Sequence, residues 1–129
     1  MKALSVRQPW PWCMEHLGKD IENRSWWTPY RGPLLIHAAK GMTRADYEDC
    51  LATIHHISRA HPFPEGVTLP PFANLPRGGI VGQTTLVDCV AASKSPWFFG
   101  RNGFVLRDFK PLPFRPCKGA LGLFEVDAA

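Results

Sequence analysis

The stretch LSVRQPWPWCMEHLGKDIENRSW, from Leu4 to Trp26, holds the pattern that decides the fold of this chain. It begins with a short predicted strand over residues 3–6. Pro9 follows at a position that suits the first turn of a helix, because proline has no N–H group to leave unpaired there. Gly18 is placed to end that helix as its C-cap. Apolar residues recur along the helix at i, i+4 and i+7, namely Trp10, Met14 and Leu17.

A second strand, predicted over residues 20–26, gathers charged side chains on one face. Successive side chains of a strand point to opposite faces, so Glu22 and Arg24 project to the same side and Ile21 to the other. Lys19 lies directly before this strand. These three charged residues, Lys19, Glu22 and Arg24, are therefore the candidate catalytic group.

The first third of the chain carries the whole formal net charge of +4. Residues 1–45 hold seven basic and three acidic side chains, and the rest of the chain is balanced. Four of the five tryptophans lie in the same third. A positive surface rich in aromatic rings suits a partner that carries phosphates and flat bases, such as RNA. The alternative is that the tryptophans belong to the core and the charges form a solvated face.

The rest of the sequence predicts further short strands and one long helix. The segment LLIHAAK, residues 34–40, is apolar on both faces, as in a barrel or a covered sheet. Thr43 begins a helix with an apolar stripe, which we interpret as structural. Residues 62–79 hold five prolines and are expected to form a long surface loop. Further strands are predicted over 80–90, 104–109 and 121–126, and residues 110–118 as an edge connection. Together these elements predict a small α+β barrel.

Composition and length narrow the class of protein. A chain of 129 residues suits one domain, and no apolar run approaches the roughly 18 residues that a membrane span needs. The N-terminus shows no signal-peptide pattern, so a cytoplasmic protein with reduced cysteines is expected. The four cysteines form no CxxC pair, and helical spacing keeps Cys50 and the nearby histidines from converging on one ion. No metal site is predicted.

Several motifs in the chain resemble those of the ASCH domain, a PUA-like family. The motifs are LSVRQPW, GKDIENRSW, YRGPLLIHAAK, GGIVG and KGALGLFEV, and they run over nearly the whole chain. The resemblance implies a small standalone member that forms a single domain over residues 1–129. It also implies a PUA-like β-barrel with two principal helices flanking a cleft, and an association with RNA or modified nucleosides.

The resemblance also places particular residues at the cleft. Some small members remove the acetyl group of N4-acetylcytidine with a lysine in a GxK element, a threonine three residues on and a later glutamate, and other members are ribonucleases. Lys19 matches the lysine, Glu22 stands where the threonine would be, and no later glutamate is assigned. The residues that the similarity places in or near the cleft are Ser5, Arg7, Gln8, Lys19, Glu22, Arg24, His37 and Lys40.

The charged group suits hydrolysis without a cofactor. Burial beside arginines would favour the neutral amine of Lys19, which makes it the first candidate for proton transfer. Glu22 could accept a proton or orient water, and the arginines could stabilise developing negative charge. The alternative is that Glu22 and Arg24 form an ion pair that only shields the strand, with Lys19 solvated beside it.

Three aromatic residues complete the predicted binding set. Trp26, or its neighbour Trp27, could stack on a base, and Tyr30 could supply a proton in RNA cleavage. Trp97 lies in the loop SKSPWFFGRNG, which is either a base-stacking lip or a plug of the barrel with at least one ring buried. Two classes of function follow: a metal-independent hydrolase acting on RNA or on N4-acetylcytidine, and a non-catalytic RNA-binding module that uses the same cleft. The sequence leaves the oligomeric state open.

Overall fold

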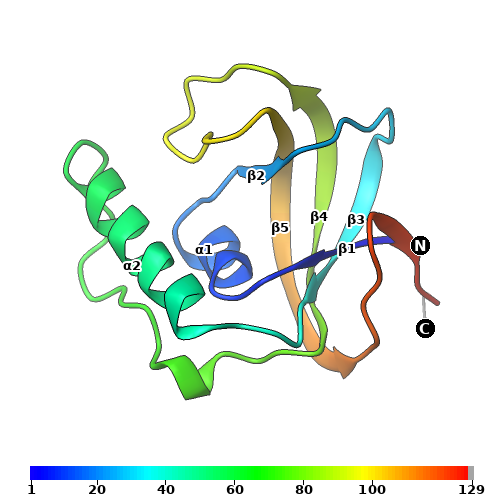
Figure 1. Cartoon of the computed structure of the whole chain (residues 1–129), viewed down its shortest axis with the longest axis horizontal. Helices are drawn as coiled ribbons and strands as arrows, with labels where there is room; N and C mark the ends of the chain where they lie inside the picture. Colours follow the sequence, from blue (N-terminus) through cyan, green and yellow to red (C-terminus); the bar gives the residue numbers. More distant parts are fainter. Residues whose placement is uncertain (128–129) are drawn as a thin grey trace.

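The computed structural model describes residues 1–127 as a mixed α+β domain (Figure 1). Both helices lie on the same side of a curled sheet, and α1 sits between α2 and the sheet. No helix in the described part of the chain is long and apolar enough to cross a membrane. The elements are β1 (Lys2–Val6), α1 (Trp10–His16), β2 (Ile21–Arg24), β3 (Gly32–Ala38), α2 (Arg44–Ser58), a 3-10 turn (Phe72–Asn74), β4 (Gly79–Val90), β5 (Asn102–Pro116) and β6 (Leu123–Glu125).

The six strands form one sheet in the order β2-β5-β4-β3-β1-β6. Only β1 and β3 run parallel, and the other neighbours are antiparallel. The curled sheet is an open half-barrel, because its two edge strands, β2 and β6, are short and do not pair with each other. The mixed α+β class is confirmed and the architecture is consistent with a PUA-like barrel, but the closed barrel predicted from the sequence is corrected to a half-barrel.

Strand β5 is longer than its sequence predicts. Residues 110–116 continue the pairing with β4 as far as Pro116, which lies opposite Gly79, so the predicted edge connection is wrong there. The prolines fit because β2 pairs only with the start of β5, from Asn102 to Val105. Beyond Val105 the other side of β5 has no strand beside it, and a proline there removes no ladder hydrogen bond.

Two apolar clusters position the helices against the sheet. One lies inside the curl and includes fully buried Phe104. The second joins α1 to α2 through Cys13 and Cys50, whose sulfurs are 3.5 Å apart as free thiols. Trp10 packs against both clusters. Burying each large apolar side chain contributes about 2–3 kcal/mol, so α1 is firmly held against both α2 and the sheet.

Helix α2 begins where the sequence predicts. The Thr43 hydroxyl accepts the Asp46 N–H at 3.0 Å, and the Asp46 carboxylate accepts the Thr43 N–H at 2.8 Å. This reciprocal capping box satisfies two backbone donors that the first turn leaves free. The predicted apolar stripe is buried at Tyr47, Cys50 and Ile57, whereas Leu51 remains 42% exposed.

Candidate functional site

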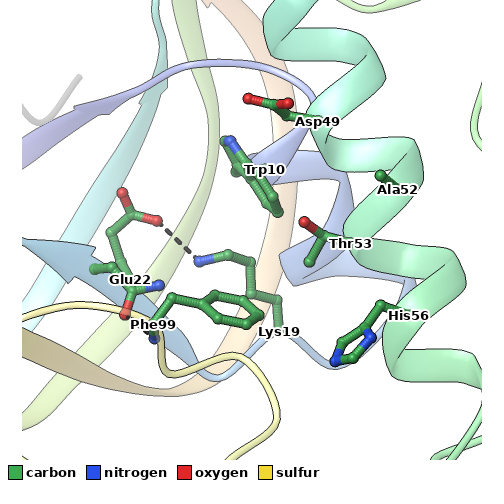
Figure 2. A pocket seen from close by; sticks show the side chains of 9 residues that line it. Trp10, Lys19, Glu22, Asp49, Ala52, Thr53, His56 and Phe99 are labelled. Carbon is green, nitrogen blue, oxygen red and sulfur yellow. Dashed lines mark hydrogen bonds and ion pairs between the residues drawn. The ribbon is translucent and has the colours of Figure 1, made fainter.

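A cavity of about 530 Å³, the aromatic cavity, opens between α1, β2, α2 and the loop before β5 (Figure 2). Side chains from the first half of the chain supply most of its wall, and the loop supplies one ring. A volume of this size suits a small organic ligand. The lining residues are Trp10, Lys19, Glu22, Asn23, Asp49, Ala52, Thr53, His56 and Phe99.

The floor of the aromatic cavity is a buried chain of charges. Lys19 is 5% exposed, and its Nζ donates to Glu22 Oε1 at 2.9 Å and to the Ile21 carbonyl. The other carboxylate oxygen, Glu22 Oε2, lies 3.0 Å from Arg24 Nη2. Glu22 therefore stands between two cations, and the direct neighbour of Lys19 is a carboxylate instead of the arginines expected from the sequence. The predicted solvated position of Lys19 beside a surface ion pair is also not what the structure shows.

Two aromatic rings border these charges. Lys19 Nζ lies 5.8 Å from the centroid of the Trp10 ring, and Trp10 and Phe99 flank the Lys19 side chain in Figure 2. Phe99 is 57% exposed, so most of its ring is open to a ligand. Asn23 fixes the loop that carries this ring, because its Oδ1 accepts the Phe99 N–H at 2.8 Å and its Nδ2 donates to the Trp97 carbonyl at 2.9 Å.

Helix α2 forms the opposite wall, which sequence reasoning missed. Figure 2 shows Asp49, Thr53 and His56 projecting from α2 toward the cavity. Its apolar stripe, together with acidic residues that suit a helix N-terminus, had favoured a purely structural role for this helix. Asp49, Thr53 and His56 recur at i, i+4 and i+7, so they form a second, polar stripe beside the apolar one. That spacing is the signal that could have found them.

A middle hollow of about 400 Å³ is lined by two residues of the aromatic cavity, Trp10 and Glu22. Arg24 Nη2 also donates to the Ser5 carbonyl here, at 2.8 Å. Arg7 pairs with Asp46 at 2.8 Å and so ties this hollow to the start of α2. The residues that line it are Ser5, Val6, Arg7, Trp10, Glu22, Arg24, Ala39, Ala120, Leu121 and Gly122.

The Asp46 carboxylate at this junction has a pKa below that of an ordinary aspartate. The hydrogen bond from the Thr43 backbone is the largest cause that holds the pKa of Asp46 below its usual range, and the Arg7 guanidinium adds to it. Both contacts favour the charged carboxylate.

A third hollow, the basic hollow, has a volume of about 690 Å³ and begins at Ser5. His37 is 2% exposed at its floor. Its Nε2 lies 2.7 Å from the Cys117 carbonyl, which can only accept, so Nε2 carries the proton. The other ring nitrogen, Nδ1, lies 2.9 Å from the Ser5 hydroxyl. The residues that line this hollow are Ser5, His37, Lys40, Arg77, Gly78, Cys117, Lys118 and Gly119.

Four residues of the predicted binding set lie outside these three hollows. Gln8 is 2% exposed, and its side chain joins the Pro76 carbonyl at 2.9 Å to the start of α1. Trp97 is 3% exposed in the second apolar cluster, so at least one ring of its loop is buried, as expected. Phe99 takes the exposed place in the cavity wall that the sequence suggested for Trp97.

The aromatic residues after β2 also lie away from the aromatic cavity. Trp26 packs edge-on against Phe104, with 5.0 Å between ring centroids. The Tyr30 hydroxyl donates to the Pro33 carbonyl at 2.5 Å. Neither ring lines one of the three hollows. Their positions follow from the turn that directs the chain into β3.

The described residues contain no group of three or more His, Cys, Asp and Glu side chains arranged to hold a metal ion.

The ASCH domain family model matches residues 4–102 of the chain. Activating signal cointegrator 1 of Homo sapiens is 34% identical over 90 residues, which cover 69% of this chain and 14% of the relative. Activating signal cointegrator 1 of Mus musculus is 31% identical over 89 residues, with the same two coverages. The chain therefore spans only a small part of the length of these relatives. The family match covers most of the chain, and the chain belongs to the ASCH domain family.

Proposed function

We propose that the protein binds single-stranded RNA or a modified nucleoside and that the aromatic cavity receives one base. The observation that carries this proposal is the pairing of an open aromatic wall, Trp10 and Phe99, with a buried ionic floor of Lys19 and Glu22. Aromatic faces bind the flat surface of a base, and fixed polar groups bind its edge. Membership in the ASCH domain family also favours an RNA-binding domain.

The polar groups of the cavity suit the edges of a nucleobase. Asp49 and Thr53 lie on α2 and the Lys19–Glu22 pair lies on the opposite wall, so donors and acceptors border the cavity on two sides. Glu22 and Lys19 are held by each other before any ligand arrives, so little side-chain freedom is lost when a base binds. The geometry thus favours recognition of one flat, polar ring.

Metal-independent hydrolysis of the same ligand is the second candidate function. It is favoured by the buried Lys19–Glu22 pair, which faces the hydroxyl of Thr53 and the imidazole of His56 across the cavity. In this scheme Lys19 moves a proton, Glu22 orients water and Arg24 stabilises an oxyanion or a phosphorane. The substrates would be N4-acetylcytidine or RNA. We rank binding above hydrolysis because both carboxylate oxygens of Glu22 already contact cations.

Binding is tested by titrating N4-acetylcytidine and a short single-stranded RNA into the wild type, Trp10→Ala and Trp27→Ala. Trp27 is the matched control, because it is 57% exposed and lies outside the three hollows. We expect Trp10→Ala to weaken binding of both ligands at least tenfold and Trp27→Ala to leave it unchanged, since stacking contributes about 1–3 kcal/mol per base. Circular dichroism of each variant checks that it is folded. Equal losses in folded variants would contradict the proposal.

Hydrolysis is tested by incubating the same two ligands with wild type and Lys19→Met, with products identified by mass spectrometry. Loss of the acetyl group, or RNA fragments, that depends on Lys19 supports the hydrolase. Intact ligands in the presence of measurable binding leave the protein as a binding module.

A further inference from the structure

The basic hollow is the part of the site that base binding does not use. Three of its lining residues are cations, Lys40, Arg77 and Lys118, and none of its lining residues is acidic. All three side chains are exposed. A concave surface lined by one sign of charge concentrates ions of the opposite sign. The basic hollow therefore has the electrostatic character of an anion site.

These three cations also lack acidic partners. Across residues 1–127, no ion pair involves Lys40, Arg77 or Lys118. Arg77 donates to the Lys40 carbonyl at 3.5 Å, and its guanidinium lies 5.5 Å from the ring centroid of Phe72. The two arginines of the middle hollow, by contrast, each contact a carboxylate. Among the three hollows, cations without an acidic partner are thus found mainly in the basic hollow.

The three cations come from separate segments that backbone hydrogen bonds hold together. Gly78 N–H donates to the Ala38 carbonyl at 2.7 Å, and Cys117 N–H donates to the Gly78 carbonyl at 3.1 Å. The first bond holds the residue after Arg77 against a residue two positions before Lys40. The second holds the residue before Lys118 against the residue after Arg77. The backbone therefore holds the three segments that carry these cations next to one another.

The floor of the basic hollow is fixed as well. His37 joins Ser5 on β1 to the Cys117 carbonyl after β5. A Cβ atom at Gly119 would lie 2.8 Å from His37 Cε1, so only glycine lets the backbone approach this closely. The segment that carries Lys118 is thereby held against the sheet.

The three hollows are neighbours on the molecule. The aromatic cavity and the middle hollow share Trp10 and Glu22, and the middle and basic hollows share Ser5. We propose that the basic hollow is a binding site for the phosphodiester backbone of an RNA strand whose base occupies the aromatic cavity. This inference rests on the proposed function. It adds a second, phosphate-directed site and a path for the strand across Ser5.

The test compares the wild type with the triple variant Lys40→Ala/Arg77→Ala/Lys118→Ala. The matched control is Arg59→Ala/Lys94→Ala/Lys110→Ala, which removes the same charge from exposed positions outside the three hollows. Each protein is titrated with N4-acetylcytidine, inorganic phosphate and a single-stranded RNA pentanucleotide over a range of salt concentrations. The first triple should make the slope of log K against log salt shallower by about 2 for the pentanucleotide, because each single-strand phosphate contact contributes about 0.7. Its affinity for N4-acetylcytidine should stay at the wild-type value.

The outcomes separate this inference from the proposed function. Equal slopes and affinities for the two triple variants would overturn the phosphate site, while loss of nucleoside binding in Trp10→Ala would still support the aromatic cavity. A shallower slope together with no nucleoside binding by the wild type would overturn the base site and keep the phosphate site. Inorganic phosphate binding as tightly as the pentanucleotide would show a free-anion site and overturn the strand path. If the wild type binds none of these ligands, the result contradicts both the base site and the phosphate site.

Discussion

The aromatic cavity and the basic hollow each share lining residues with the middle hollow, and they differ in how their charges are paired. In the aromatic cavity Lys19 is buried against Glu22, which also contacts Arg24. In the basic hollow the cations are exposed and lie outside the ion pairs formed by residues 1–127. Internally paired charges give a rigid surface that recognises shape and hydrogen-bond pattern, whereas unpaired charges attract a polyanion without regard to its sequence. We therefore expect the aromatic cavity to be the selective site and the basic hollow to be the non-selective one.

The largest effect is expected from breaking the buried charge pair. Glu22→Gln leaves Lys19 buried without a counterion, which should lower the free energy of unfolding by about 3 kcal/mol or more. Glu125→Gln removes the same charge from an exposed carboxylate that contacts the N-terminus and Lys2, and should leave the urea midpoint nearly unchanged. Urea unfolding followed by circular dichroism compares the two variants. Equal midpoints would mean that the aromatic cavity is as solvated as the basic hollow.

Removing the exposed ring of the aromatic cavity should change binding without changing stability. Phe99→Ala should weaken binding of N4-acetylcytidine by about tenfold, because one stacking face is lost. Phe114→Ala is the control, since Phe114 is 46% exposed on β5 and lines none of the three hollows. Isothermal titration calorimetry measures both. A similar loss in the two variants would show that nonspecific hydrophobic contact accounts for binding.

Most of the fold was predictable because its signals are local. The helical spacing of apolar residues in α1, the alternation of side chains between the two faces of β2 and the Thr43 cap of α2 each depend on residues close together in the sequence. All three elements are present in the structure. Whether the sheet closes depends on how its two edges meet, which no local pattern encodes. The continuation of β5 through its prolines likewise depends on how short β2 is.

The candidate site was predictable on one wall only. The β2 alternation brought Glu22 and Arg24 to one face, where the structure has them in contact. The α2 wall and the basic hollow arise from tertiary packing, since Arg77 is far in sequence from Lys40 and Lys118. Trp97 and Phe99 belong to the same aromatic run, and only contacts with Asn23 and the second apolar cluster decide which ring is exposed.

A smaller effect is expected at the junction of α2 with the middle hollow. Asp46→Asn should lower the thermal midpoint at neutral pH, because it weakens the capping box and the contact with Arg7, at a cost of about 1 kcal/mol or less. The folded-state pKa of Asp46 is lowered, so its stabilising contribution is present above the unfolded pKa of about 3.9 and is lost as pH falls through the folded value. The difference between variant and wild type should therefore shrink on acidification below that pH. A difference independent of pH would contradict a role for the charge.

The smallest effect is expected in the reactivity of the cysteine thiols, which differs between buried Cys13 and Cys117 in the basic hollow. The hydrogen bond between Cys13 and Cys50, and to a lesser extent burial, raises the pKa of the Cys13 thiol, so Cys13 should resist alkylation in the folded protein. Cys117 lines the basic hollow and is partly exposed, as is Cys89 on β4. The RNA pentanucleotide should slow iodoacetamide labelling of Cys117 and leave Cys89 unaffected, as read by peptide mass spectrometry. Equal protection of Cys89 and Cys117 would argue against a strand in the basic hollow.

The most direct test of the account is a titration of the ¹⁵N-labelled protein with N4-acetylcytidine and then with the RNA pentanucleotide, followed by two-dimensional NMR. We expect the nucleoside to shift the Trp10 indole N–H and the backbone N–H groups of Thr53 and Phe99. The pentanucleotide should add shifts at Gly78 and Gly119. Shifts confined to the exposed Trp27 indole and the β2–β3 turn, with the Trp10 indole unmoved, would contradict the claim that the aromatic cavity binds a base.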